Sequence, residues 1–197
     1  LGVNIAENIA RRNKNVLVIS LEMSDIQIMA KRIANEAKMS YNKLLAGGLT
    51  DTERDTALGA AGILSSRPFD LIDKSKMTVV DIGRAARQIK GLEAIVIDYL
   101  QLVKPNDTDS NKPRYEIMTD ISANLKALAK LLGIPVVALC QLNRESTKGA
   151  DKRPHMQDLR DTGAIEQDAD AIILLHRPEY YADKNAEDYV KPMFEQI

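Results

Sequence analysis

The sequence has no tryptophan, only two phenylalanines and a single cysteine in 197 residues. So few aromatic rings argue against a nucleic-acid site built on base stacking. A lone cysteine argues against a disulfide framework. Cys140 lies inside an apolar run, so we expect a small buried side chain in a protein of a reducing, cytoplasmic compartment.

An excess of charge of one sign is also missing. The chain has 27 basic and 28 acidic residues and a net charge of −1, so overall electrostatics give no support for nucleic-acid binding and any such contact must be local. No apolar stretch approaches the roughly 18 residues that span a bilayer, and no signal-peptide pattern opens the chain. We therefore expect a soluble protein with no membrane partner, in which residues 1–197 form a single domain around a substantial core.

Short apolar runs indicate the strands. They are nearly continuous and rich in β-branched residues, as is typical of strands buried on both faces of a parallel sheet. The strong runs are Val16–Ser20, Ala94–Ile97, Pro135–Cys140 and Ala171–Leu175, and a weaker fifth is Phe69–Asp73.

Helical patterns lie between these runs. The clearest is Tyr115–Leu132, where apolar residues recur at spacings of three and four. Other helices are predicted from Val3 to about Arg12, from Ser24 or Asp25 to about Lys38, from Thr50 to about Ser65, and from Thr78 to about Lys90. A capping box marks the start at Thr50, Thr78 with Asp81 is a looser version of it, and the polar stretches 104–114 and 143–154 predict surface loops. The alternation predicts an α/β fold, with a mostly parallel twisted sheet flanked by helices on both faces.

Polar residues follow three of the apolar runs. Glu22 comes just after the first, Asp98 closes the second and Gln141 follows the third. Ligands of open α/β sheets bind beyond the carboxyl ends of the strands, so these three side chains are expected to converge on one edge.

Each residue suits phosphoryl transfer. Asp98 can orient Mg²⁺ and its waters against nucleotide phosphates, Glu22 can polarise the attacking water, and the neutral Gln141 can bond to a γ-phosphate without adding charge. A single acidic residue after a strand is more often the start of a solvated loop. The positions of these residues alone do not exclude an α/β enzyme that does not bind nucleotide.

Four segments resemble successive motifs of the DnaB-type replicative helicase motor domain, in the same order and over essentially the whole chain. The most specific is the thirteen-residue run Asp158-Leu-Arg-Asp-Thr-Gly-Ala-Ile-Glu-Gln-Asp-Ala-Asp170. The others are Ser20-Leu-Glu-Met23, Ile95-Val-Ile-Asp-Tyr-Leu-Gln-Leu102 and Val136-Val-Ala-Leu-Cys-Gln-Leu-Asn-Arg144. The resemblance implies a RecA-like P-loop NTPase core that uses ATP and Mg²⁺ to translocate on single-stranded DNA and unwind duplex DNA in replication. It also implies a homo-hexamer, a primase and a helicase loader as partners.

The resemblance also assigns roles to individual residues. Glu22 matches the catalytic glutamate, Asp98 the Walker B aspartate that acts on Mg²⁺ through water, and Gln141 the glutamine that links the γ-phosphate to the DNA-binding loops. Arg160, Asp161 and Gly163 match the loop that contacts the phosphate backbone of single-stranded DNA. Lys152 and Arg153 lie in the preceding loop, where residues 143–160 carry a local excess of two positive charges; a solvated surface loop fits the same charges.

The sequence departs from the family pattern in some places. Asp161, Thr162 and Cys140 stand where Glu, Ser and Ser are common, which leaves the resemblance intact. No Gly-x-x-x-x-Gly-Lys-Ser/Thr loop occurs in the chain. We therefore expect a motor domain cut short at both ends, before that loop and before the basic arginine-finger segment, and inefficient ATP hydrolysis by these 197 residues alone.

Two alternatives remain at this stage. A RecA- or RadA-type recombinase core shares the fold, although the motif 158–170 argues against it. A non-catalytic DNA-binding or assembly module fits the missing phosphate loop, although the retained Glu22, Asp98 and Gln141 argue against it. His155 and His176 have no cysteine or third histidine at ligand spacing and do not predict a zinc site.

Overall fold

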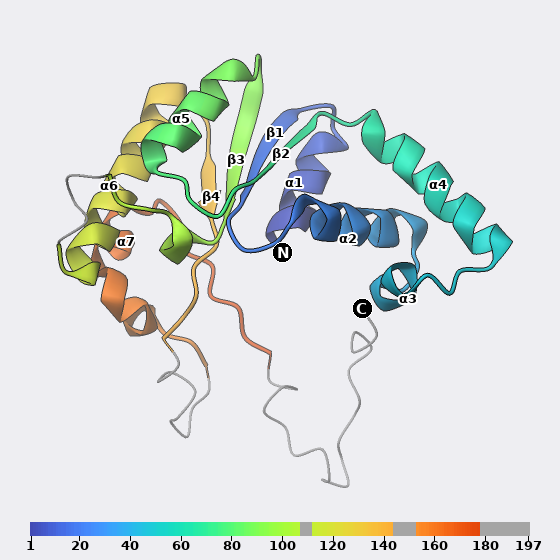
Figure 1. The fold of residues 1–197 in the computed structure, drawn as a ribbon. Helices are drawn as coiled ribbons and strands as arrows, with labels where there is room; N and C mark the ends of the chain where they lie inside the picture. Colours follow the sequence, from blue (N-terminus) through green and yellow to red (C-terminus); the bar gives the residue numbers. More distant parts are fainter. Residues whose placement is uncertain (107–111, 144–152, 178–197) are drawn as a thin grey trace, which may run out of the picture.

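A computed structural model describes residues 1–106, 112–143 and 153–177. Its centre is a sheet of four parallel strands in the order β2-β1-β3-β4 (Figure 1). The strands are β1 (Asn15–Ser20), β2 (Phe69–Asp73), β3 (Leu92–Asp98) and β4 (Val136–Ala138). The α/β class and the parallel sheet are therefore confirmed.

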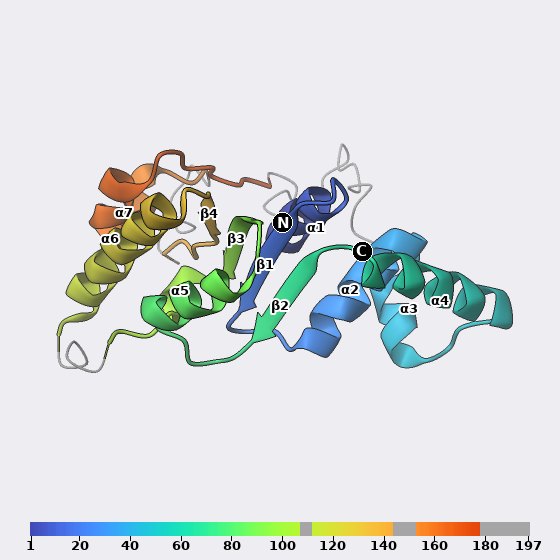
Figure 2. The same ribbon diagram turned by 90° about the horizontal axis from the view of Figure 1, so that it is seen from above.

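Helices cover both faces of this sheet, as the view from above shows (Figure 2). On one face α1 (Gly2–Ala10) packs its small residues against the first set of alternating strand residues, which includes Val18 and Val96. On the other face α5 (Val79–Gln88) and α6 (Arg114–Leu132) pack against the second set, which includes Ile19 and Ile97. Each inner strand is thus buried on both sides, which explains why its sequence does not alternate.

The predicted helix starts are present with their caps. The hydroxyl of Thr50 accepts the amide of Glu53 at the start of α4 (Asp51–Ser65), while the Glu53 side chain accepts the Thr50 amide. Thr78 and Asp81 form the same reciprocal pair at α5. Ser24 is the N-cap of α2 (Asp25–Ala37). Local side-chain chemistry therefore sets where these helices begin.

Close packing brings α1 onto the sheet. Gly2 is buried, and an added Cβ would lie 2.9 Å from Leu139 Cδ1 and 3.2 Å from Val96 Cγ1. Both atoms belong to side chains, so a larger residue would require Leu139 and Val96 to shift. Glycine therefore favours a close approach here rather than a turn.

Buried ion pairs join α1 and α2 to the start of β2, and we call Glu7, Arg32, Glu36 and Arg67 the ion-pair cluster. Arg32 Nε lies 2.7 Å from Glu7 Oε2, and the Arg32 guanidinium stacks 3.6 Å from the Phe69 ring centroid. Arg67 pairs with Glu7 and also with Glu36, at 2.8 Å for the latter. The cluster ties two helices to the sheet through charges that are mostly shielded from water.

Several elements differ from the expectation. Short helices α3 (Tyr41–Ala46) and α7 (Gly163–Asp168), and the 3-10 segments η1 (Leu100–Leu102) and η4 (Met156–Thr162), were not predicted because each is too short to show a periodic pattern. Within the described ranges, no helix has the length and apolar character that crossing a membrane requires.

The prediction of a strand at Ala171–Leu175 is wrong. This segment has no regular secondary structure, and its side chains at Ile173 and Leu175 are 78% and 61% exposed. β4 spans only three residues, and no ladder joins the segment to it within the described structure. An apolar run becomes a strand only when a neighbouring strand supplies hydrogen bonds, and sequence does not reveal that neighbour.

Candidate functional site

The carboxyl ends of the strands align at one edge of the sheet. Ser20, the last residue of β1, pairs in register with Asp98 at the end of β3 and with Asp73 at the end of β2. On the far side of β3, Ile97 pairs with Ala138, the last residue of β4. The segments that carry Glu22, Asp98 and Gln141 therefore leave the sheet side by side, as expected for an open parallel sheet.

Glu22 stands in a turn that is held from both sides. The Ser20 hydroxyl donates to the Met23 carbonyl at 2.6 Å and accepts the Met23 amide at 3.2 Å. The Leu21 amide donates to the Asp98 carbonyl at 2.8 Å, and the Leu21 side chain is buried. Glu22 itself is exposed, so a fixed backbone presents its carboxylate to solvent at the sheet edge.

Asp98 is half-buried at the end of β3. Burial, and then the negative charge of Glu22, raise the pKa of the Asp98 carboxyl above its ordinary value, and the positive charge of Lys31 opposes them. Both effects act because the ionised form loses solvation and meets a like charge. The two carboxylates are thus close enough to interact, and a cation between them would relieve their repulsion.

Lys31, on α2, is a side-chain cation whose charge acts on this edge. Its Nζ lies 3.3 Å from Met23 Sδ and 5.7 Å from the Tyr41 ring centroid. Within the described part of the chain, Lys31 makes no ion pair with a carboxylate. Its charge therefore remains available to an anion at the sheet edge.

Gln141 follows the short strand β4 and is exposed. Its backbone is held by the side chain of Gln101, in η1: the Gln141 amide donates to Gln101 Oε1 at 3.2 Å, and Gln101 Nε2 donates to the Gln141 carbonyl at 2.9 Å. Gln101 Nε2 also lies 3.1 Å from Cys140 Sγ, and burial raises the pKa of the Cys140 thiol. Cys140 is half-buried rather than fully enclosed, so its expected burial is confirmed only in part.

The segment predicted to contact DNA is only partly described. The backbone of Arg160 and Asp161 lies in η4 and that of Gly163 begins α7, whereas Lys152 and the side chains at 160–164 lie outside the described residues. Arg153 is exposed. The Asn143 amide donates to the Asp158 carbonyl at 3.1 Å, so η4 is tied to the chain leaving β4.

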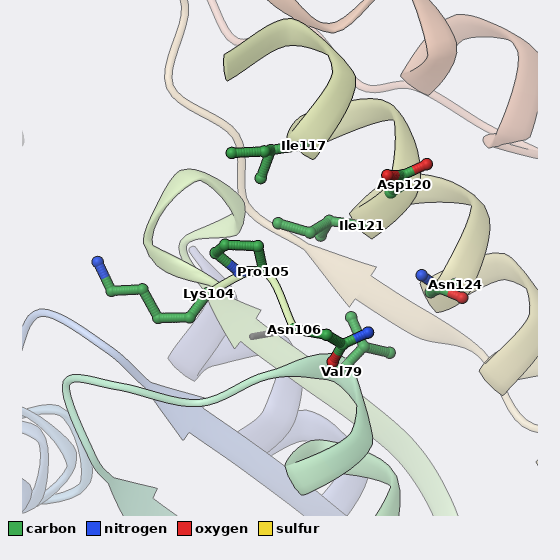
Figure 3. A pocket seen from close by; sticks show the side chains of 8 residues that line it. All are labelled: Val79, Lys104, Pro105, Asn106, Ile117, Asp120, Ile121 and Asn124. Atoms are coloured by element: carbon green, nitrogen blue, oxygen red, sulfur yellow. The ribbon is translucent and has the colours of Figure 1, made fainter. Parts of the chain in front are cut away.

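A separate small pocket lies between α6 and the segment after η1 (Figure 3). Ile117 and Ile121 of α6 face Lys104 and Pro105 across it, and its volume is about 10 Å³. That is room for about one water molecule, and no predicted site residue lines it. Within the described ranges, no group of three or more His, Cys, Asp or Glu residues is arranged to hold a metal ion.

The edge of the sheet thus presents two interacting carboxylates, a lysine without an ion-pair partner in the described structure and a glutamine with a fixed backbone. These features belong to a chain that matches a known protein family. The family model for the DnaB-like helicase C terminal domain matches residues 1–196. The chain belongs to this family. The match excludes the alternative of a recombinase core.

Named relatives support the assignment to the DnaB-like family. The chain is 40% identical over 191 residues to the replicative DNA helicase DnaB of Geobacillus stearothermophilus, covering 95% of this chain and 42% of that protein. It is 42% identical over 194 residues to DnaB of Haemophilus influenzae (strain ATCC 51907 / DSM 11121 / KW20 / Rd), covering 95% of this chain and 41% of that protein. The chain therefore spans less than half the length of these relatives.

Solved structures agree. One solved ATPase domain superposes with a TM-score of 0.88 at 33% identity, over 94% of this chain and 66% of that one. A DnaB-like replicative helicase, solved to show its interactions with primase, superposes with a TM-score of 0.86 at 33% identity, over 92% of this chain and 44% of that one. The RecA-like architecture of the DnaB-like domain is thereby confirmed.

Two residues at this edge were not given a role from sequence. Gln101 stands inside the motif Asp98-Tyr-Leu-Gln101, but its partner is 40 residues away and only the fold brings them together. Lys31 is eight residues from Met23 on a helix whose other exposed charges look alike in sequence. No local sequence pattern distinguishes either residue from an ordinary polar residue on the surface.

Proposed function

We propose that this DnaB-like domain is the ATP-hydrolysing motor of a replicative DNA helicase, in which turnover drives movement along single-stranded DNA and unwinding of the duplex. The observation that carries the proposal is the pair Glu22 and Asp98, which leave neighbouring parallel strands at one edge and lie close enough for the charge of Glu22 to help raise the pKa of the Asp98 carboxyl. The relatives named above as replicative DNA helicases support it.

The residues at the edge fit a magnesium nucleotide. Mg²⁺ is commonly held through one or two carboxylates, with waters and phosphate oxygens completing its shell. Asp98 is the residue to hold it, through water, because its half-buried carboxyl carries a negative charge that the described surroundings only partly offset. Mg²⁺ bound there would draw charge from the ATP phosphates and so favour attack at the γ-phosphate.

The other two residues divide the remaining work. Glu22, on its fixed turn, orients a water for attack and accepts its proton. Gln141 bonds to the γ-phosphate through its neutral amide, which both donates and accepts. Within the described residues, no hydrogen bond holds the Gln141 side chain, so the amide is free to respond to the nucleotide.

Substitution of Glu22 tests this function. ATP turnover is measured on the longest polypeptide that the gene encodes, because the 197 residues contain no phosphate-binding loop of their own. In Glu22→Ala and Glu22→Gln, turnover should fall by about a hundredfold or more, the contribution of a general base, while binding of a fluorescent ATP analogue persists. Glu93→Gln, at an exposed carboxylate in β3, should leave turnover unchanged. Undiminished turnover in the Glu22 variants would sink the proposal.

The DNA-facing part of the proposal concerns Arg160, Asp161, Gly163, Lys152 and Arg153. Contacts from these residues to the phosphate backbone, made partly through main-chain N–H groups, would be independent of base sequence, as a motor moving along any DNA requires. Arg160→Ala should weaken binding to oligo-dT and to mixed-sequence single strands equally and reduce the salt dependence by about one phosphate contact. The exposed Arg12→Ala is the matched control. Equal affinity of the Arg160→Ala and wild-type proteins would remove this loop from the DNA path.

Assembly completes the proposal. A helicase motor of this type works as a homo-hexamer in the cytoplasm, with primase and a helicase loader as partners. For the primase alone, the support is a structural relative that was solved to show its interactions with primase. Sedimentation of the longest encoded polypeptide with ATP and Mg²⁺ should give the mass of a hexamer, and a monomer under those conditions would contradict the assembly.

A further inference from the structure

The side chain of Gln101 extends the sheet past its last strand residue. The β3–β4 ladder ends at Ile97 and Ala138, and only two backbone bonds continue it, from Leu139 N–H to the Ile97 carbonyl at 2.9 Å and from Leu100 N–H to the Leu139 carbonyl at 2.8 Å. Beyond that point β3 has turned into η1, and its backbone no longer runs beside Gln141. The backbone of Gln141 therefore needs another partner.

The side chain of Gln101 supplies both the hydrogen-bond acceptor and the donor that the Gln141 backbone needs. Its Oε1 accepts the Gln141 amide at 3.2 Å, and its Nε2 donates to the Gln141 carbonyl at 2.9 Å. A primary amide presents one donor side and one acceptor side as a peptide group does, and it carries no charge. The two hydrogen bonds pair the Gln141 backbone as a neighbouring β-strand would, with the Gln101 side chain in place of the strand.

The position of Gln101 is itself rigid. Leu100 and Val103, on either side of it in sequence, are each 3% exposed and belong to the core between the sheet and α6. The Val103 amide donates to the Leu100 carbonyl at 3.1 Å and closes the turn of η1. Gln101 is thus anchored three residues after Asp98, and it fixes a residue on the neighbouring strand exit.

The contacts continue from Gln141 toward η4. Two residues further along, Asn143 N–H donates to the Asp158 carbonyl at 3.1 Å, and the next side chain, Leu159, is 4% exposed. Two sets of hydrogen bonds, joined by the intervening chain, therefore connect Gln101 to the backbone of Gln141 and Asn143 to η4. The Gln141 side chain is the only part of that residue that these bonds leave unheld in the described structure.

We infer that Gln101 is a positioning residue for Gln141: it locks the Gln141 backbone, so that the Gln141 side chain alone responds to the nucleotide. This rests on the proposed function for the role of Gln141, whereas the clasp itself rests on geometry alone. Without the clasp, the chain after β4 would move as a whole and the glutamine amide would no longer be aimed. The expected loss is in kcat rather than in the KM for ATP, because both sides of the Gln101 amide are already bonded to the Gln141 backbone.

Three variants separate positioning from simple space filling. Gln101→Leu has a similar size and removes both hydrogen bonds. Gln101→Glu keeps the acceptor for the Gln141 amide but sets a carboxylate oxygen against the Gln141 carbonyl. Gln88→Leu, at an exposed glutamine that ends α5, is the matched control.

The first readout does not involve ATP. Amide hydrogen exchange at Gln141 is followed by NMR in the 197-residue chain, with circular dichroism to check that each variant is folded. Exchange should accelerate about tenfold in Gln101→Leu and stay slow in Gln101→Glu and Gln88→Leu. If Gln101→Leu fails to fold, Gln101→Ala takes its place, because it also removes both hydrogen bonds: fast Gln141 exchange there supports the clasp, and slow exchange overturns it. Slow exchange in a folded Gln101→Leu overturns the inference whatever the function of the protein.

The second readout is ATP turnover of the longest encoded polypeptide, with and without single-stranded DNA. We expect kcat to fall about tenfold in Gln101→Leu, with a KM close to that of the wild type, and the stimulation by DNA to fall with it. Gln101→Glu, which keeps the bond to the Gln141 amide, should lose less. Unchanged kcat and stimulation in a variant with fast Gln141 exchange would overturn the positioning role. A wild-type protein that does not hydrolyse ATP at all would instead contradict the proposed function and leave the exchange result standing.

Discussion

The two ends of the sheet use the same kinds of residue for opposite purposes. In the ion-pair cluster beside the start of β2, both carboxylates are paired with guanidinium groups: Glu7 with Arg32 and Arg67, and Glu36 with Arg67 and Arg11. At the carboxyl edge, Glu22 and Asp98 lie close enough for their charges to interact, and the described structure shows no ion pair for either. Paired charges hold elements together, whereas unpaired ones are ready for a ligand, and residue type alone does not separate the two cases.

The largest change in stability is expected when the ion-pair cluster loses a cation. Arg32→Met should lower the free energy of unfolding by about 3 kcal/mol, because it leaves Glu7 buried with one guanidinium instead of two. The Arg32 Nη2 atom has no hydrogen-bond partner within the described structure, so its removal offsets part of the loss and places the cost at the low end for a buried pair. Urea unfolding measures it.

The control for that experiment is Arg84→Met. Arg84 pairs with Asp81 on the surface of α5, where its side chain is 69% exposed, and such pairs contribute about 0–1 kcal/mol. If the Arg32 and Arg84 variants unfold at the same urea concentration, the cluster does not hold the helices to the sheet.

A second, smaller effect follows from the acid titration of the cluster. Hydrogen bonding to Arg67, and also to Arg11, lowers the pKa of Glu36 from 4.5 to about 2. A carboxyl with a depressed pKa contributes stability that is complete above its unfolded value and lost as the pH falls through the folded value. The wild type should therefore lose stability between about pH 4.5 and pH 2, and Glu36→Gln should show a shallower loss in that window.

Thermal unfolding at several pH values checks the Glu36 prediction. Glu93→Gln changes a carboxylate that is exposed and pairs only with Lys14 on the surface, and it serves as the comparison. Parallel acid profiles for the wild type and Glu36→Gln would mean that Arg67 does not stabilise the ionised Glu36.

The smallest effect has the opposite sign and lies at the other end of the sheet. Because the pKa of Asp98 is raised, its ionised form costs the folded protein stability above that pKa. Asp98→Asn should thus slightly raise the melting temperature at neutral pH while it abolishes ATP turnover. The gain should shrink as the pH falls toward the ordinary range of aspartate, where the wild type becomes protonated too. A lower melting temperature for Asp98→Asn at pH 7 would contradict the unpaired state of this edge.

The features that the sequence predicts best are those with a local cause. The capping boxes at Thr50 and Thr78 were predicted because donor and acceptor are three residues apart. The convergence of Glu22, Asp98 and Gln141 on one edge followed from the parallel strands, and the register of Ser20 with Asp98 agrees with it. The predicted strand at Ala171–Leu175 is absent, because strand formation depends on a partner strand that periodicity does not reveal.

The amino-acid sequence by itself determined the family, the parallel α/β class and the identity of the polar residues that close the strands, because these depend on apolar periodicity and on short ordered motifs. Only the tertiary structure decided which charges are paired and which are free. It placed Glu7 between two arginines, set Glu22 beside Asp98, and joined Gln101 to a backbone 40 residues away. Such contacts join residues distant in the chain, and the energies of charges and hydrogen bonds depend on burial and distance, which exist only once the chain has folded.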